Sequence, residues 1–212
     1  MKNKIIIIGG GGHAKSLIDL INSTRSYKIV GIVDPNIKIG TKILDIKVLG
    51  TDNKLNYFRK MGIKFLALGL GSEGNNQKRF RLWKKFVDKG FRFPKLIHKK
   101  SIISKYSLIH DGVQVFANSV INAGSVIRDI SVINTHSVVE HDCKIGLNVF
   151  TGIGVKICGR TKIDNNVFLG ANSCILPKIK IEKNALIAAG ALVHKDIKKN
   201  LKVKGVPAKK FL

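Results

Sequence analysis

His141 is the residue whose neighbours point most directly to chemistry. The chain reads Glu140-His141-Asp142, and no other histidine has an acid on both sides. A neutral imidazole accepts a proton near pH 7, and a carboxylate on its other ring nitrogen fixes the tautomer and raises the basicity. The segment therefore predicts a general base that takes the proton from an amine or hydroxyl nucleophile, with Asp142 or Glu140 as its partner.

A six-residue repeat surrounds His141 and runs through the C-terminal half. Every sixth residue from Ile97 to Val193 is aliphatic except Thr151, and a second series from Ser101 to Ala191 is small or β-branched at every step. A helix repeats every 3.6 residues and a strand every two. A period of six instead predicts a parallel β-helix with three short sides and about 18 residues per coil.

This coil length predicts which residues lie beside the candidate base. Gly159 follows His141 by one coil, and a glycine there can leave its backbone N–H open to a developing oxyanion. Cys143 belongs to the small series, so we expect it to point inward and to be a poor nucleophile. Glycines that follow the aliphatic position, such as Gly152 and Gly170, predict tight turns with unusual backbone angles.

From about Pro94 to its end, the chain resembles the hexapeptide-repeat acyltransferases, both in the repeat and in the closing Gly205-Val206-Pro207-Ala208-Lys209. The resemblance implies a left-handed β-helix, a homotrimer, and acetyl-CoA bound in the groove between neighbouring prisms. It favours Asp142 as the partner of His141, and it places the oxyanion donor at Gly159.

The same resemblance suggests where acetyl-CoA is bound. Family members often carry a second histidine nine residues after the catalytic one, and this chain has Phe150 there. The positions matched to CoA binding are Phe150, Ala171 and Ala189, the two alanines through backbone groups. Lys209 and Lys210 are candidates for the 3′-phosphate of CoA.

The N-terminal half predicts a small nucleotide-binding α/β unit of the Rossmann type. The apolar run from Ile5 to Ile8 reads as a buried strand, and strands alternating with helices indicate a short parallel sheet. Gly9-x-Gly11-x-x-Ala14 follows the first strand, with Asp34 20 residues beyond Ala14. Such glycines let the backbone approach a pyrophosphate at the helix N-terminus, and the acid can accept hydrogen bonds from ribose hydroxyls.

Nearly the whole chain resembles the sialic-acid/bacillosamine-pathway sugar acetyltransferases. The similarity lies in the Gly9–Lys15 loop, Val48–Thr51, Phe93–His98 at the junction, and the repeat. It implies that the N-terminal unit holds a nucleotide-activated amino sugar, with Lys15 as a candidate phosphate contact. The substrate-binding residues predicted in this way are Gly10, Gly11, Gly12, His13, Asp34, Gly71 and Asn134.

Composition limits the class of protein. Hydrophobic residues make up 44% of the 212 residues, yet no apolar run approaches the roughly 20 residues needed to span a bilayer. We therefore expect a cytoplasmic protein without membrane insertion. The three cysteines have no zinc-ligand spacing and favour reduced thiols rather than a disulfide framework, and we predict no metal. The net charge of +25 is spread along the chain without interleaved aromatics, so we predict no nucleic-acid partner.

Together these patterns predict two domains, a Rossmann-like unit over residues 1–93 and a left-handed β-helix with a C-terminal tail over residues 94–212. The predicted reaction is acetyl-CoA-dependent N-acetylation of the free amine of a nucleotide-linked amino-deoxy sugar, such as a UDP-4-amino-4,6-dideoxy sugar, for surface glycan biosynthesis. O-acetylation of a sialic-acid-type sugar is the nearest alternative. An NAD-dependent oxidoreductase and a non-catalytic scaffold are the others.

Overall fold

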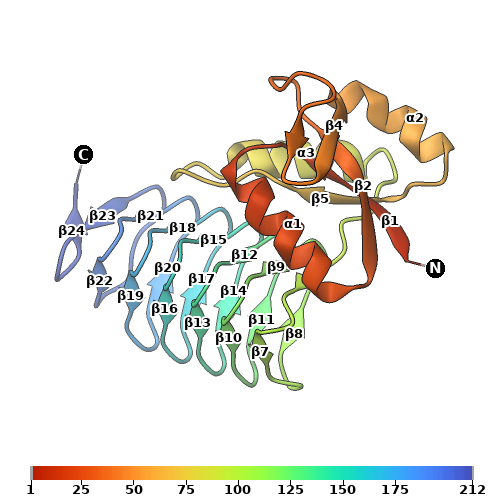
Figure 1. Ribbon diagram of the computed structural model, residues 1–212. Coiled ribbons are helices and arrows are strands. Elements are labelled where there is room, and N and C mark those ends of the chain that lie inside the picture. Colours follow the sequence, from red (N-terminus) through yellow and green to blue (C-terminus); the bar gives the residue numbers. More distant parts are fainter. Residues whose placement is uncertain (1, 212) are drawn as a thin grey trace.

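The computed structural model describes residues 2–211, which form an α/β N-terminal unit followed by a left-handed parallel β-helix (Figure 1). The β-helix is a three-sided prism whose sheets contain eight, six and five strands, here called face 1, face 2 and face 3. Face 1 contains β6 (Leu96–Ile97), β9 (Gln114–Val115), β12 (Val132–Ile133), β15 (Phe150–Thr151), β18 (Phe168–Leu169), β21 (Leu186–Ile187), β23 (Lys202–Lys204) and β24 (Lys209–Lys210). Face 2 contains β7 (Ile102–Ile103), β10 (Val120–Ile121), β13 (Val138–Val139), β16 (Lys156–Ile157), β19 (Cys174–Ile175) and β22 (Leu192–Val193). Face 3 contains β8 (Leu108–Ile109), β11 (Val126–Ile127), β14 (Lys144–Ile145), β17 (Lys162–Ile163) and β20 (Lys180–Ile181).

Strand register confirms the predicted coil. Val120 pairs with Val138, and Val138 with Lys156, so each coil advances by 18 residues. The second residue of these strands points inward, and the aliphatic and small series together form the buried core of the prism. The first residue points outward, so the outward columns decide what each face can pack against.

The corners of the prism correct one prediction. A residue with left-handed backbone angles recurs every sixth position, for example at Asn118, His136 and Asp142. Gly152 and Gly170 are not among these residues. A Cβ on either would instead collide with backbone atoms of the following coil, at Ala171 and Ala189 respectively. Glycine is required at these two positions because the backbone of the next coil leaves no space for a Cβ, and the φ angles of both residues lie outside the left-handed region.

The N-terminal unit has a five-stranded sheet in the order β3-β4-β2-β1-β5. Its strands are β1 (Asn3–Ile8), β2 (Tyr27–Val33), β3 (Lys42–Ile43), β4 (Ile46–Gly50) and β5 (Phe65–Leu68). Its helices are α1 (Gly12–Thr24), the 3₁₀ turn η1 (Asp52–Lys54), α2 (Leu55–Lys60) and α3 (Gln77–Val87). The expected alternation of strands and helices is present in β1–α1 and β5–α3, whereas the β3–β4 hairpin, η1 and α2 were not anticipated. β3 is antiparallel to β4, and the remaining pairs within the sheet are parallel.

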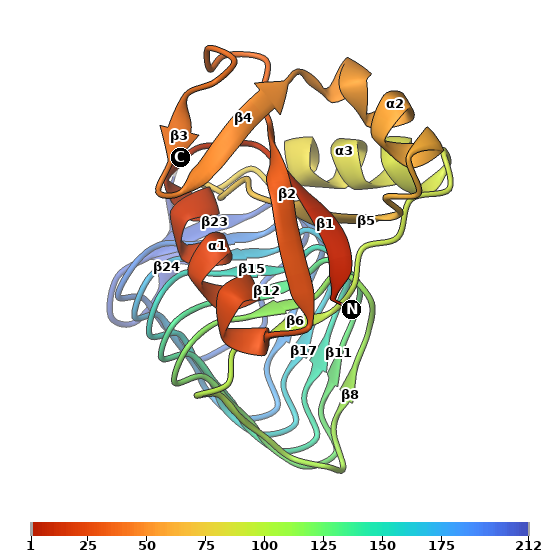
Figure 2. The same cartoon turned by 45° about the vertical axis from the view of Figure 1, so that its right-hand side comes forward.

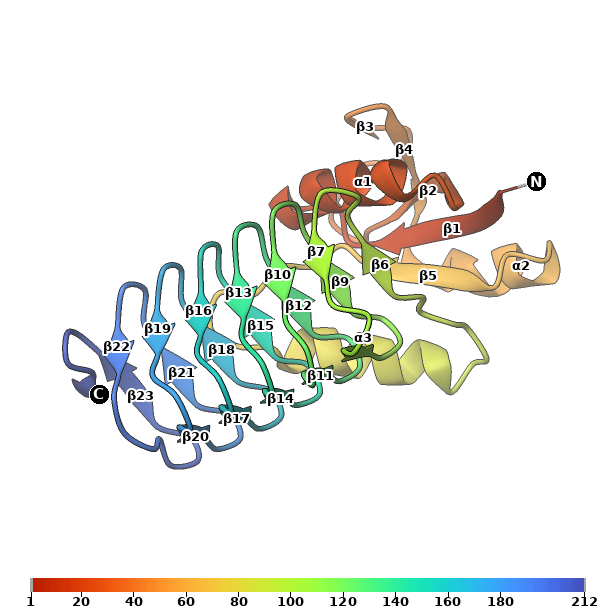
Figure 3. The same cartoon turned by 90° about the horizontal axis from the view of Figure 1, so that it is seen from below.

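The alternating side chains of β1 explain how this unit sits on the prism. Ile5 and Ile7 pack with α1 against outward side chains of face 1, including Val132 and Phe150. Ile6 and Ile8 face the opposite side, where α2 and α3 supply the core. The N-terminal unit therefore covers face 1 at the first coils, while the later coils extend beyond it (Figures 1 and 3).

Hydrogen bonds of buried polar side chains also join the N-terminal unit to the prism. Asn76, at the start of α3, donates to the carbonyls of Asn148 and Val167, and Asn148 donates back to the Asn76 carbonyl. The buried guanidinium of Arg79 donates to the carbonyls of Leu70 and Ile130. Since buried polar groups are costly without partners, these bonds favour one fixed placement of the N-terminal unit on the prism.

Candidate active site

His141 lies in the turn between β13 and β14, at the corner where face 2 meets face 3. Its Nδ1 is 2.9 Å from Asp142 Oδ2, while Glu140 contacts only the backbone N–H of His141. The Nδ1–H therefore donates to Asp142, which leaves a lone pair on Nε2. The imidazole is 53% exposed, so Nε2 is accessible to a substrate. This is the tautomer that a base acting through Nε2 needs.

Gly159 lies directly beside that nitrogen. A Cβ placed on Gly159 would be 2.7 Å from His141 Nε2, so any other residue would displace the imidazole. The Gly159 N–H donates no hydrogen bond to any of residues 2–211. The corner thus presents a bare ring nitrogen and a free backbone donor next to each other, which is the pairing that acyl transfer uses.

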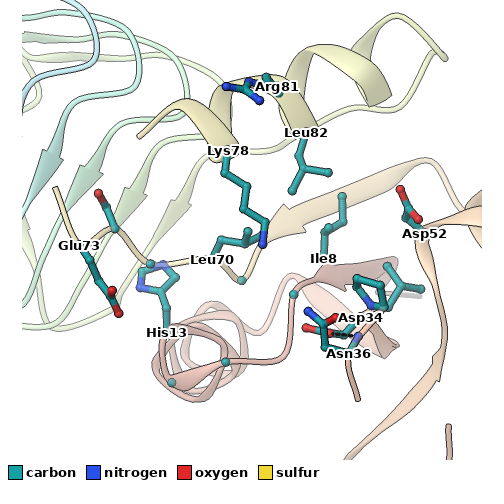
Figure 4. Close-up of a pocket in the computed structure, with 18 of the residues that line it drawn as sticks. Ile8, His13, Asp34, Asn36, Asp52, Leu70, Glu73, Lys78, Arg81 and Leu82 are labelled. Carbon is teal, nitrogen blue, oxygen red and sulfur yellow. Dashed lines mark hydrogen bonds between the residues drawn. The ribbon is translucent and has the colours of Figure 1, made fainter. Parts of the chain in front are cut away.

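A cavity of about 1220 Å³ opens in the N-terminal unit (Figure 4). Of the residues predicted to bind substrate, it is lined by Gly11, Gly12, His13, Asp34 and Gly71. Lys78 of α3 also lines it and extends toward the loop between β1 and α1 (Figure 4). The first turn of α1 and a lysine opposite it suit a diphosphate.

Two of the predicted residues, Gly10 and Lys15, do not line the cavity, and Asp34 also braces the loop between β1 and α1. Gly10 lies outside the cavity wall and donates its N–H to Asp34 Oδ2 at 2.8 Å. Asp34 Oδ1 accepts the N–H of Asn36 at 2.8 Å, so both carboxylate oxygens brace the loop and keep their remaining lone pairs. Lys15 is exposed on α1 and is not part of the cavity wall.

The residues matched to acetyl-CoA divide into two groups. Phe150 is only 5% exposed, because it lies beneath the N-terminal unit against His13 and Phe168. Ala171 and Ala189 lie at the corner between faces 1 and 2, and neither N–H donates to a described residue. Lys209 and Lys210 lie exposed on β24.

Asn134 lies at the same corner as Ala171 and Ala189. Within one chain, the predicted site residues therefore fall into two separate groups. The cavity and the free alanine donors lie at face 1 and at its corner with face 2. His141 and Gly159 lie at the corner opposite face 1, with the body of the prism between (Figure 2). A single chain does not bring His141 to the cavity.

Sequence reasoning missed two buried residues next to His13. Between β6 and β21, Gln114 is the one polar member of the outward column on face 1, whose other members there are Leu96, Val132, Phe150, Phe168 and Leu186. Arg79 is the one charged residue on the helix face that carries Trp83 and Phe86. Each is a polar residue at a position where the pattern predicts an apolar one. A polar residue at such a buried position could have been recognised in the sequence as a candidate site residue.

Cys143 is fully buried, and burial raises the pKa of its thiol to about 11, so the thiolate needed for nucleophilic attack is scarce. Among residues 2–211, no group of three or more His, Cys, Asp or Glu side chains is placed to hold a metal ion. The helices in the same range are too short or too polar to cross a membrane.

Comparisons with known proteins show the fold and the family of the chain. Residues 4–86 match the PglD N-terminal domain family, residues 138–167 the hexapeptide repeat of succinyl-transferase, and residues 160–195 the bacterial transferase hexapeptide family. PerB from Caulobacter crescentus, solved in complex with CoA and GDP-perosamine, is 32% identical with a TM-score of 0.92 over 99% of this chain and 97% of that one. The acetyltransferase domain of PglB from Neisseria gonorrhoeae, solved with acetyl coenzyme A, is 29% identical with a TM-score of 0.91 over 100% of both chains. WeeI from Acinetobacter baumannii shares the fold at 21% identity, with a TM-score of 0.85 over 99% of this chain and 100% of that one. The chain belongs to the hexapeptide-repeat, acetyl-CoA-dependent N-acetyltransferases of nucleotide-linked amino sugars, with a PglD-type N-terminal domain.

Proposed function

We propose that this chain acetylates the free amine of a nucleotide-linked amino-deoxy sugar by direct attack on acetyl-CoA. The amine nitrogen forms a bond to the thioester carbonyl carbon and gives its proton to His141 Nε2. The Gly159 N–H stabilises the oxyanion, the C–S bond breaks, and the CoA sulfur leaves with the proton that His141 returns. Asp142 holds the imidazole in the tautomer that this sequence of proton transfers needs.

One observation carries this proposal: His141 Nε2 has no proton in the Asp142-bound tautomer and lies against Gly159, whose N–H is free. The similarity to PerB supports an amine rather than a hydroxyl acceptor, since PerB was solved with GDP-perosamine and a perosamine N-acetyltransferase from the same organism, Caulobacter crescentus, is 31% identical to this chain. A cytoplasmic location fits both the acetyl-CoA donor and three free cysteines.

We further propose that the working enzyme is a homotrimer with each site shared by two chains. The outward column of face 2 is mostly apolar, with Ile102 67% exposed, Val120, Val138 and Leu192 half-buried, and Lys156 the one charged member. Face 2 also separates His141 and Gly159 on one edge from Ala171 and Ala189 on the other. Packing along this face would set the base of one chain beside the alanine donors and the cavity of its neighbour.

Thiol release from acetyl-CoA tests the reaction. UDP-, GDP- and CMP-linked sugars, each with a free amine or with hydroxyls only, are compared for wild type and His141→Ala. We expect one amino sugar nucleotide to give rapid release that falls at least about 100-fold in the variant. Release with hydroxyl sugars alone would make the chain an O-acetyltransferase, and an unchanged rate in His141→Ala would contradict the role of the base.

Mixing two inactive variants tests the shared site. A Cβ on Gly11 meets nothing within 4 Å, so Gly11→Glu puts a carboxylate into the cavity without disturbing the packing. Chains with His141→Ala and chains with Gly11→Glu are unfolded together at equal amounts and refolded. In a cyclic trimer, about a quarter of the shared sites then combine two intact halves, and activity returns to that level. No recovery would show that each site belongs to one chain.

A further inference from the structure

The orientation of Gln114 can be derived from its hydrogen bonds. This side chain is 2% exposed on face 1, and its Nε2 donates to the Leu68 carbonyl at 2.9 Å. A carbonyl oxygen only accepts, so the amide nitrogen must face Leu68. The amide oxygen therefore faces His13, where Oε1 is 2.9 Å from the ring Nε2. Since Oε1 also only accepts, the proton of a neutral His13 ring belongs on Nε2.

The surroundings of the ring favour its neutral form. Phe116 and Phe150 pack against it with ring centroids 5.3 Å and 5.8 Å away. Behind Phe150 lies the buried guanidinium of Arg79, 5.5 Å from the Phe150 centroid and with no carboxylate partner among residues 2–211. A second positive charge in this apolar setting is costly. Burial and the charge of Arg79 accordingly lower the pKa of His13 to about 4.

The other ring nitrogen, Nδ1, is left with a lone pair. It accepts no hydrogen bond from residues 2–211, and His13 lines the cavity. Glu73 and Lys78 are charged side chains of the cavity wall, and Figure 4 draws Glu73 on the same side of the cavity as the His13 ring. A lone pair repels a phosphate oxygen, and Glu73 repels it too. The diphosphate therefore belongs with the backbone N–H groups at the start of α1 and with Lys78, and the imidazole of His13 is left to another part of the substrate.

We propose that His13 Nδ1 accepts a hydrogen bond from a donor on the sugar, either its amino group or a hydroxyl, and so selects the sugar rather than the nucleotide. The inference rests on the proposed function, because it assumes that the cavity holds a sugar nucleotide. It gives His13 the role of a neutral acceptor, in contrast to the phosphate-binding cation that its place after a glycine loop suggests.

Two amide variants, each with a polar atom near one ring nitrogen, separate the roles of Nε2 and Nδ1. His13→Gln keeps a donor near Nε2 but loses the acceptor near Nδ1, whereas His13→Asn can place its amide oxygen near Nδ1. Calorimetry measures the binding of UDP and GDP, and of their 4-amino-4,6-dideoxy and 4-hydroxy-6-deoxy sugar derivatives. We expect His13→Gln to weaken the preferred sugar nucleotide about tenfold while the nucleoside diphosphate binds unchanged, and His13→Asn to retain most of the affinity.

Equal weakening of the nucleoside diphosphate would overturn the proposal, as would equal loss in both variants. The two sugar series bear on the donor: a loss confined to the amino sugar identifies the amine, and a loss in both shows that a hydroxyl can also serve as the donor.

A second measurement is independent of turnover. In protein labelled with ¹⁵N-histidine, we expect the His13 nitrogens to show one protonated Nε2 and one bare Nδ1 at pH 7, and Gln114→Leu to abolish this preference. A protonated Nδ1 in wild type would contradict the inference even if acetylation proceeds. If the tautomer is as expected but no sugar nucleotide binds, the proposed function fails, and the role of His13 fails with it.

Discussion

Replacement of Gly159 by alanine tests the geometry of the base most directly. The new Cβ would lie 2.7 Å from His141 Nε2, 2.9 Å from Cε1 and 3.2 Å from Cδ2, all inside the usual contact limit of 3.4 Å. The imidazole must therefore move by about 0.7 Å or rotate away. A misplacement of about 1 Å can lower a rate roughly 100-fold, so we expect kcat to fall by a factor of about 30 to 100. The ring is half-exposed and free to swing outward, so the free energy of unfolding should change by less than about 0.5 kcal/mol.

Steady-state thiol release and chemical denaturation measure the two effects separately. Gly62→Ala is a control away from the site, because Gly62 has a φ of +83° and a Cβ there would meet nothing within 4 Å. That change should cost about 1–2 kcal/mol of stability and leave kcat unchanged. If Gly159→Ala keeps wild-type kcat while it folds normally, the reasoning about His141 is refuted.

The backbone donor of Gly159 needs a different comparison. Pro177 occupies the same turn position one coil later, so the prism accepts proline there. In a His141→Ala background, where the clash is gone, Gly159→Pro removes the N–H and Gly159→Ala keeps it. We expect the residual single-turnover rate to be roughly 100-fold lower with proline. Equal residual rates would show that this N–H does not stabilise the oxyanion.

Three further outcomes follow from the structure. Gly11→Glu should weaken sugar-nucleotide binding at least about 100-fold by placing a like charge against the diphosphate, with Gly11→Gln as the neutral control of equal size; equal effects in calorimetry would contradict the charge argument. Between pH 6.5 and about 4 the unfolded chain binds a proton that folded His13 resists, so the free energy of unfolding should fall as the pH is lowered, by up to roughly 3 kcal/mol, and urea denaturation should show a smaller loss in His13→Gln. The buried Cys143 thiol should react with a maleimide at pH 8 only after denaturation, and mass spectrometry that finds it modified at equal rates in folded protein would show that its environment is open.

The prism was predictable because its repeat is a property of single residues. One aliphatic and one small residue in every six fix which side chains point inward, and the observed register follows with no tertiary information. The position of Gly159 beside His141 follows from the same periodicity. The reason for each glycine could not be predicted from the repeat. Gly154 provides a positive φ, whereas Gly152 lies too close to the next coil for a side chain, and the sequence alone does not tell these two cases apart.

The N-terminal unit was harder to predict, since its site depends on contacts between distant segments. Gln114 and Leu68 meet only after β5 and β9 are brought together, and His13 takes its tautomer from that meeting. Asp34 could be found from its spacing, but its two backbone hydrogen bonds depend on the fold of the loop. Arg79 reads as one more surface cation among 38 Lys and Arg until its helix face is matched to the prism.

The height of the residues along the prism restricts how two chains can share a site. Val132 of face 1, His141 of the opposite corner and Phe150 of face 1 follow one another within a single coil, and Val132 pairs with Phe150. His13 packs on Phe150, so the candidate base and the sugar side of the cavity lie at the same level. A neighbour placed alongside without an axial shift would bring its His141 to that level, whereas a shift of one coil would offset the base by about 4.8 Å. Closed cyclic symmetry involves no axial shift, and helical stacking does. The levels of these residues therefore favour a ring of chains, which accords with the proposed trimer.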